Sequence, residues 1–106
     1  VLTVLYSNEL IAGKTATDAF AIATANAAAG NPVAQFFEGY FRQNGLGTAP
    51  SAPLAAAAYQ RAVDQGYLHA SSFLAEMYER GAEGVEADPL RAAGLYWSAL
   101  AGKDPT

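Results

Sequence analysis

The residues best suited to chemistry in this chain lie between positions 69 and 79. His69 is the only histidine, and Ser72 follows it by three residues, so the two would be neighbours on one helix. A serine beside a histidine could act as a nucleophile with its base, but this pair brings no oxyanion hole with it. We therefore predict no catalytic residue and keep a hydrolase only as a remote alternative.

Metal and cofactor sites lack their usual ligands. The chain has no cysteine, and His69 has no second histidine near it. Glu76 would lie two turns further along the same helix, which is a poor arrangement for a tetrahedral metal site. Glu76 and Glu79 are typical of a solvated helix face. We predict no metal ion and no cofactor.

Composition limits the class of protein and the kinds of partner. The chain has 106 residues, enough for one domain, and its 52% hydrophobic content with 15% charged residues excludes intrinsic disorder. The net charge of −4 and the lack of a basic stripe give nucleic acids and anionic membranes no electrostatic basis for binding. No apolar run reaches the roughly 18 residues of a membrane-spanning helix. We expect neither nucleic-acid binding nor membrane insertion.

A repeated pattern must hold these residues in place. Gly30, Gly66 and Gly102 are each 36 residues apart, and apolar positions recur at the same interval. A fixed period of this length indicates stacked helix pairs, because one pair cannot bury its apolar face alone. Alanine, the best helix former, is spread through the periodic segments. We therefore predict an all-α fold, an α/α solenoid of antiparallel helix pairs with a 36-residue period.

The period divides the chain into units. We predict a single repeat domain over residues 1–106, with units at about 1–29, 30–65 and 66–102, and expect it to be part of a longer array. Residues 1–8 are expected to be the end of a helix. Cap residues and prolines then predict helices over about 16–29, 32–44, 53–65, 68–80 and 89–101.

Two units carry the same motif of small, aromatic and turn residues. In the third unit it consists of Ala70, Leu74, Ala75, Met77, Tyr78, Gly81, Gly84, Val85, Asp88, Ala92, Tyr96 and Ala99. In the middle unit it consists of Ala34, Gly39, Phe41, Gly45, Gly47, Ala55, Tyr59, Ala62 and Gly66. This motif resembles the Sel-one-like repeat family, a relative of the tetratricopeptide repeats. The resemblance implies a right-handed superhelix and an adaptor role in assembling protein complexes, in bacteria as well as eukaryotes, with no shared catalytic residue.

Two charged residues depart from the family pattern. Glu38 stands where the family has leucine, and Arg42 stands where it has tyrosine. They are four residues apart with the glutamate first, which is the favourable order for an ion pair on a helix. We interpret them as a structural pair at the seam between two helices. The alternative is that they contact a ligand.

One helix face is the candidate binding site. At 100° per residue, four positions of the middle unit lie between its packing sides, and four equivalent positions follow 36 residues later. In stacks of the tetratricopeptide type this stripe would face the concave surface. Aromatic rings in one unit and carboxylates in the next suit a peptide with apolar anchors and a Lys or Arg. The predicted partner-binding residues are Val33, Phe36, Tyr40, Gln43, His69, Ser72, Glu76 and Glu79.

Alternatives stay open for this face and for the whole chain. Phe36 and Tyr40 could pack against a neighbouring helix rather than bind a partner. The favoured function is a scaffold or adaptor that binds a peptide or partner protein on its concave face. The runner-up is an architectural spacer within a longer repeat protein, with no ligand of its own. Trp97 stands where the family has a polar residue, so self-association through exposed array ends is a further alternative.

Overall fold

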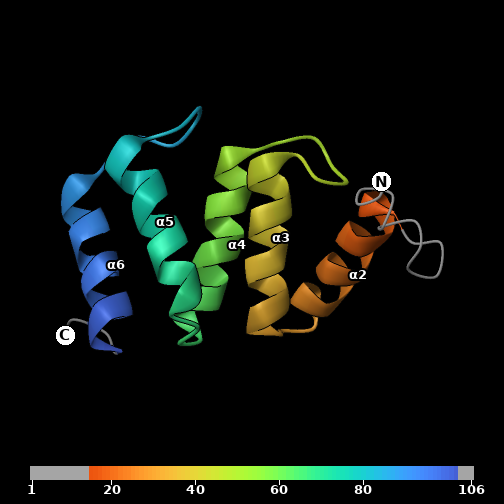
Figure 1. Ribbon diagram of the computed structural model, residues 1–106, viewed down its shortest axis with the longest axis horizontal. Coiled ribbons are helices and arrows are strands. Elements are labelled where there is room, and N and C mark those ends of the chain that lie inside the picture. Colours follow the sequence, from red (N-terminus) through yellow and green to blue (C-terminus); the bar gives the residue numbers. More distant parts are fainter. Residues whose placement is uncertain (1–14, 103–106) are drawn as a thin grey trace, which may run out of the picture.

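The structure, a computed structural model, describes residues 15–102. Over this range the chain forms five α-helices and no strand (Figure 1). The helix end expected at residues 1–8 lies outside the described residues. The helices are α2 (Ala16–Ala28), α3 (Pro32–Asn44), α4 (Ala52–Asp64), α5 (His69–Arg80) and α6 (Pro89–Ala101).

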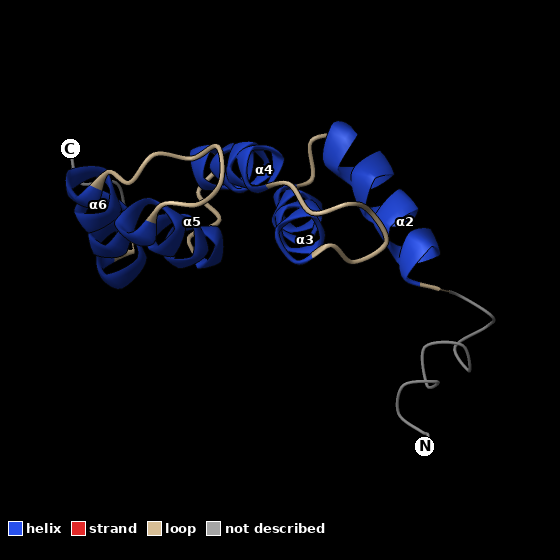
Figure 2. Cartoon of the chain, turned by 90° about the horizontal axis from the view of Figure 1, so that it is seen from above, coloured by secondary structure: helices blue, strands red, loops and turns tan. Residues whose placement is uncertain are grey.

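The helices stand in a row in the order in which they occur along the chain (Figure 1). The principal axes of the molecule measure 45 × 26 × 24 Å, and each helix packs mainly against the helix before it and the helix after it. Seen from above, α3 and α5 lie on one side of the row and α4 lies on the other (Figure 2). Across the described range, every helix falls short of the length and hydrophobicity that crossing a bilayer requires. The all-α solenoid predicted from the repeat is confirmed.

Each of the first two helices begins beside a residue whose side chain accepts a hydrogen bond from a free backbone N–H group. Thr15 Oγ1 accepts a hydrogen bond from the N–H of Asp18, and the Thr15 N–H donates to the Asp18 carboxylate, which completes a capping box. Asn31 caps α3 by accepting from the N–H of Ala34, and Pro32 occupies the first turn. Both starts agree with the sequence.

The start of α4 differs from the prediction. The helix was expected to open at Pro53, but Ser51 is its N-cap and accepts a hydrogen bond from the N–H of Leu54. The Ser51 N–H in turn donates to the carbonyl of Arg42 at 2.8 Å, which ties the loop back to α3 and lets the helix begin at Ala52. Pro53 therefore occupies the second helical position, where its missing N–H still leaves no bond unmade.

The start of α4 lies 36 residues after the start of α2, whereas the start of α6 lies 37 residues after the start of α4. The N-caps Thr15 and Ser51 belong to α2 and α4, and the N-cap of α6 is Asp88. The extra residue lies in the turn between α5 and α6, where Ala82 and Val85 exchange backbone hydrogen bonds of 2.9 and 2.8 Å. The helix starts therefore do not establish a uniform period of 36 residues.

The core lies between α3, α4 and α5. Tyr59 and Leu74 are its largest fully buried side chains, and Ala55, Ala62 and Ala70 around them are also without exposed surface. The small alanines let the helix backbones approach closely enough to enclose the large side chains. Burying a side chain such as Leu74 stabilises the fold by about 1.5–3 kcal/mol relative to leaving it in water.

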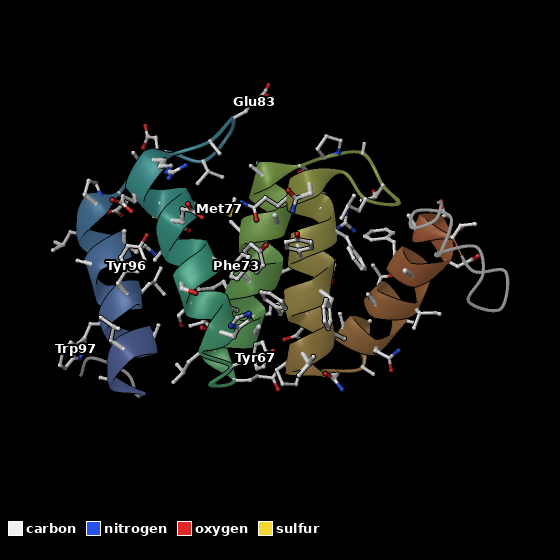
Figure 3. All side chains as sticks on the ribbon, in the orientation of Figure 1. Tyr67, Phe73, Met77, Glu83, Tyr96 and Trp97 are labelled. Atoms are coloured by element: carbon white, nitrogen blue, oxygen red, sulfur yellow. The ribbon has the colours of Figure 1, made fainter. Side chains whose placement is uncertain are left out.

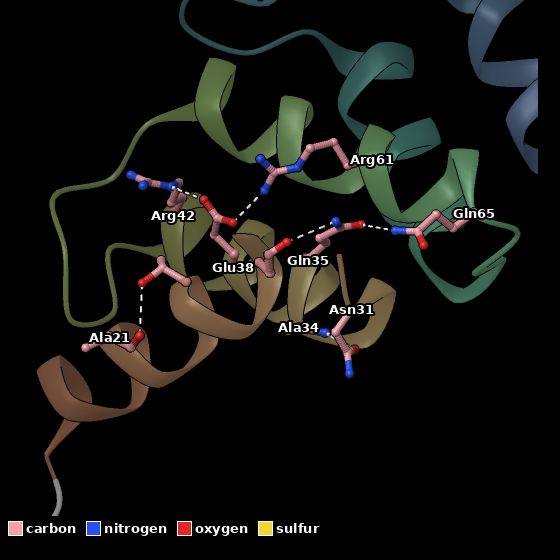
Figure 4. Close-up of polar contacts among 10 residues, drawn as sticks. Ala21, Asn31, Ala34, Gln35, Glu38, Arg42, Arg61 and Gln65 are labelled. Carbon is pink, nitrogen blue, oxygen red and sulfur yellow. Dashed lines mark hydrogen bonds and ion pairs between the residues drawn. The ribbon is translucent and has the colours of Figure 1, made fainter. Parts of the chain in front are cut away.

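A buried carboxylate joins α3 to α4 (Figure 4). Glu38 is only 9% exposed. It accepts a hydrogen bond from Arg42 Nε at 3.1 Å on its own helix and from Arg61 Nη2 at 2.6 Å on α4. The two guanidinium groups replace the water that the carboxylate loses on burial. The contacts therefore support the structural interpretation of this ion pair, and they add a third member, Arg61.

The buried amide of Gln35 holds the first turns of α3 in place. Its Nε2 donates to the carbonyl of Ala27 at 3.2 Å, and its Oε1 accepts from Gln65 Nε2 at 2.8 Å (Figure 4). Gln35 is 5% exposed, so both polar atoms find partners where water has little access. Helix α3 is thereby hydrogen-bonded to α2 on one side and to the end of α4 on the other.

Candidate functional site

The eight residues predicted to bind a partner lie on α3 and α5 or at their ends, and these helices share one side of the molecule (Figure 2). Only some of the eight meet at one surface. The Tyr40 ring meets the Phe73 ring edge-on, with centroids 6.1 Å apart. Beside them is a hollow of about 230 Å³ lined by Ser72, Phe73, Glu76 and Tyr96. We call Tyr40, Ser72, Phe73, Glu76 and Tyr96 the α3–α5 face.

Phe36 is not part of this face. It is 6% exposed and belongs to the core, with its ring 5.7 Å from that of Tyr59 and 5.0 Å from that of Phe73. Expecting its side chain on the concave surface was wrong, because α4 and α5 close over the ring from both sides. The packing alternative applies to Phe36.

Tyr40 keeps more of its surface. It is 39% exposed, and its ring stacks on Phe36 with centroids 6.5 Å apart while its edge meets Phe73. Phe73 is partly buried beneath it. Figure 3 shows Phe73 on the side of α5 that faces α3, and Tyr96 between α6 and α5. The two rings thus border the face from different helices.

Val33 and Gln43 serve other parts of the structure. Val33 is 41% exposed, but it lines a separate apolar groove between α2 and α3. Gln43 Oε1 accepts a hydrogen bond from the hydroxyl of buried Tyr59 at 2.7 Å. Burial, with a smaller contribution from Tyr40, raises the pKa of Tyr59 well above its ordinary value. The structure therefore does not bring Val33 or Gln43 to the α3–α5 face.

His69 and Ser72 do not form a nucleophile pair. The Ser72 hydroxyl donates to the backbone carbonyl of His69 at 3.1 Å, so its bond goes to the main chain. The exposed His69 ring packs at the edge of the aromatic cluster, 4.9 Å from the Phe36 centroid and 5.4 Å from that of Phe73. Within residues 15–102, no group of three His, Cys, Asp or Glu side chains is placed to hold a metal ion.

Glu76 gives the α3–α5 face its charge, and Glu79 lies next to that face on the same helix. Glu76 faces Arg80 of the same helix at 3.3 Å, and both side chains are at least half exposed. Glu79 Oε1 accepts a hydrogen bond from the hydroxyl of Tyr96 at 2.8 Å, which ties α6 to α5. This hydrogen bond to Glu79 is the main reason that the pKa of Tyr96 is raised. Aromatic surface, a hydroxyl group and carboxylates therefore lie side by side.

The fold is similar to two solved structures. One is c5321, a protective antigen present in uropathogenic Escherichia coli strains displaying an SLR fold, with a TM-score of 0.79 and 31% identity over 83% of this chain and 19% of that chain. The other is a Sel1 repeat protein from Oxalobacter formigenes, with a TM-score of 0.76 and 31% identity over 92% of this chain and 38% of that chain. The described helices have the Sel1-like repeat fold. No family model and no curated protein matches the sequence.

The Sel1-like repeat fold is a helical repeat that supports protein–protein interactions. This Sel1-like repeat chain spans only 19% and 38% of the two similar proteins, so the roles of those whole proteins are not assigned to it.

Sequence reasoning missed two residues of the face in this Sel1-like repeat chain. Phe73 was not among the eight residues predicted to bind a partner. Tyr96 was noted only as part of the repeat motif, although it comes from α6 and reaches Glu79 on α5. The signal for Tyr96 was available, since an aromatic hydroxyl at a repeated position often needs a polar partner on the preceding helix.

Proposed function

We propose that this Sel1-like repeat protein binds a segment of a partner protein on the α3–α5 face, which we take to be the concave face of the solenoid. The segment would carry an apolar side chain close to a Lys or Arg. The observation that carries the proposal is the hollow between Phe73 and Tyr96, with the Glu76 carboxylate among its lining groups.

The size of the hollow favours a side chain over a small molecule. Small-molecule pockets enclose roughly 300–1,000 Å³, whereas this hollow measures about 230 Å³ and is open to solvent. One apolar side chain of a bound segment could rest between Phe73 and Tyr96, with Tyr40 extending the aromatic surface towards α3. Aromatic residues in such positions contribute much of the affinity of protein interfaces.

The carboxylates favour a basic neighbour for that anchor. The ion pair of Glu76 with Arg80 is exposed, and such pairs contribute only about 0–1 kcal/mol. A Lys or Arg of the partner could therefore take the place of Arg80 at little cost. The net charge of −4 would also steer a basic segment towards the protein.

Selection from a library of short random peptides displayed on phage tests the proposal. We expect the selected peptides to be enriched in an aromatic or aliphatic residue with Lys or Arg nearby. Glu76→Lys should weaken their binding roughly tenfold, or about 1.4 kcal/mol. Glu83→Lys makes the same charge change in the turn at the tip between α5 and α6, away from the face (Figure 3), and should leave affinity nearly unchanged.

Two results would count against this function. Equal weakening by Glu76→Lys and Glu83→Lys would show that only the overall charge matters. Failure to select any peptide, with the protein folded by circular dichroism, would favour the architectural spacer instead.

A further inference from the structure

A groove lies between α4 and α6, and it shares no lining residue with the α3–α5 face. Two cavities form it, of about 540 and 390 Å³. The larger lies towards the start of α6 and the turn before it, and the smaller lies towards the end of α4. Gln60 and Arg91 line both cavities, so the groove continues past them in both directions. A bound chain could therefore pass over this pair instead of having to end beside it.

Arg91 differs from the other arginines of the described range. The other three each pair with a carboxylate, at 3.1, 2.6 and 3.3 Å. Within residues 15–102, the groups that hold the Arg91 guanidinium are neutral: Nη2 donates to Gln60 Oε1 at 3.1 Å, and Cζ lies 4.5 Å from the centre of the Tyr78 ring. A guanidinium has five N–H donors in one plane. Arg91 is thus held in position with most of its donors still available for a carboxylate.

A chain of hydrogen bonds links Arg91 to the next charge along the groove. The Gln60 side chain accepts from Arg91 through Oε1 and donates through Nε2 to Asp64 Oδ1 at 2.8 Å. Asp64 lines the smaller cavity and lies one turn beyond Gln60 on α4, a rise of about 6 Å. Two further carboxylates, Glu86 and Asp88, line the larger cavity. The charges along the groove therefore follow the order negative, positive, negative.

This order selects the chemistry of a partner. A wholly acidic segment would be repelled at both ends of the groove, and a wholly basic segment would be repelled by Arg91. Alternate side chains of an extended chain point the same way and are roughly 6.6 Å apart, which is close to the rise from Gln60 to Asp64. We propose that the groove binds an extended partner segment with the order basic, any, acidic, any, basic, and that its central carboxylate lies on Arg91.

Two labelled peptides of the same composition test the proposal on the natural protein. In fluorescence anisotropy at low ionic strength, fluorescein-Gly-Lys-Ala-Glu-Ala-Lys-Gly-amide should bind the full chain roughly fivefold more tightly than fluorescein-Gly-Glu-Ala-Lys-Ala-Lys-Gly-amide. The peptides have the same net charge, so only the order of their charges differs. Added salt should reduce the difference, because the groove is open to solvent. Equal affinities, or no binding of either peptide at millimolar protein, would overturn the proposal.

A double-mutant cycle locates the carboxylate of the first peptide. Replacing its glutamate by glutamine should weaken binding roughly fivefold with the natural protein and less than about twofold with Arg91→Gln. An equal loss with both proteins would overturn the placement of the carboxylate on Arg91. Circular dichroism checks that Arg91→Gln is folded, and the two peptides of equal composition test the proposal without any variant.

The carboxylates of the protein supply a matched pair of variants. Asp64→Asn keeps an oxygen for Gln60 but removes the charge, so it should weaken binding of the first peptide roughly threefold. Glu83→Gln removes the same charge at the tip of the turn between α5 and α6, outside both cavities (Figure 3), and should leave the affinity nearly unchanged. Equal weakening by the two variants would overturn the proposed order of charges.

Amide chemical shifts in nuclear magnetic resonance spectra decide which surface the peptide occupies. On addition of the first peptide, the amide signals of Ala57 and Gly94 in the groove should shift, and those of Ser72 and Glu76 should not. Shifts confined to Ser72 and Glu76 would overturn the proposal, because they would place the peptide on the α3–α5 face.

Discussion

Gly39 of α3 lies directly against the ring of Tyr59 of α4. A Cβ atom at Gly39 would be 2.7 Å from two of the ring carbons. The ring cannot move aside, because it is fully buried and its hydroxyl is held by Gln43. We therefore expect Gly39→Ala to lower the free energy of unfolding by about 1–2 kcal/mol, with the overpacking outweighing the better helix propensity of alanine. Urea titration followed by circular dichroism measures the change.

Gly94 in α6 is the matched control for this substitution. A Cβ atom there would meet nothing within 4 Å. Gly94→Ala should therefore raise the free energy of unfolding by about 0.5–1 kcal/mol through helix propensity alone. If both substitutions stabilised the protein, the close packing of Gly39 on Tyr59 would be wrong.

Neutralising Glu38 should destabilise the seam between α3 and α4. Glu38→Gln keeps the shape of the side chain but leaves Arg42 and Arg61 without their shared anion. We expect a loss of about 1–3 kcal/mol, the range for hydrogen bonds to charged groups with limited access to water. Glu76→Gln removes half of an exposed pair and should cost under about 0.5 kcal/mol. Similar losses for both glutamates in urea titrations would contradict the buried role of Glu38.

The hydroxyl of Tyr59 should make stability fall at alkaline pH. Burial raises the pKa of Tyr59 in the folded protein above its ordinary value of 10.0, so folded Tyr59 keeps its proton where the unfolded chain loses it. The contribution of Tyr59 to the free energy of unfolding is therefore fully present below pH 10 and declines as the pH rises through that value. Tyr59→Phe should lose about 0.5–1.5 kcal/mol at neutral pH with the Gln43 hydrogen bond, and should show a shallower alkaline decline. Parallel pH curves for the two proteins would contradict this.

Ser71 should be replaceable without loss. It is 0% exposed, and its Oγ finds no hydrogen-bond partner among the described residues. Since an unpaired buried hydroxyl is unfavourable, we expect Ser71→Ala to be neutral or to stabilise the protein by up to about 1 kcal/mol. Ser98→Ala is the comparison, because that buried hydroxyl donates to the Gly94 carbonyl at 3.1 Å and its loss should cost about 0.5–1 kcal/mol. The midpoint of thermal unfolding distinguishes the two, and a lower midpoint for Ser71→Ala would contradict its unpaired state.

The fold was predictable where the deciding contacts are local. Asn31 and Pro32 fix the start of α3 through atoms within three residues of the cap, and the sequence contains both. The predicted start of α4 was wrong because the Ser51 N–H donates to the Arg42 carbonyl, a contact across the loop that no local pattern encodes. Repeat spacing then predicted the stacking of the helices, since each unit must cover the apolar side of its neighbour.

The candidate site was less predictable for a geometric reason. A helical wheel gives the direction in which a side chain leaves its own helix, but it does not say how near the next helix comes. Phe36 and Tyr40 share a stripe, yet Phe36 is 6% exposed and Tyr40 39%, because α4 and α5 close only over the first. Tyr96 comes from a different helix altogether, so one stripe could not include it.

The row of helices also determines how the molecule would respond to tension. Each helix is supported mainly by the one on either side, and α6 mainly by α5, with one further hydrogen bond from Arg91 to Gln60 of α4. A force applied at the end after α6 would separate neighbouring helices one pair at a time instead of opening the whole core at once. The protein should thus extend in steps under force, with α6 detaching while Tyr59 remains enclosed by α3, α4 and α5.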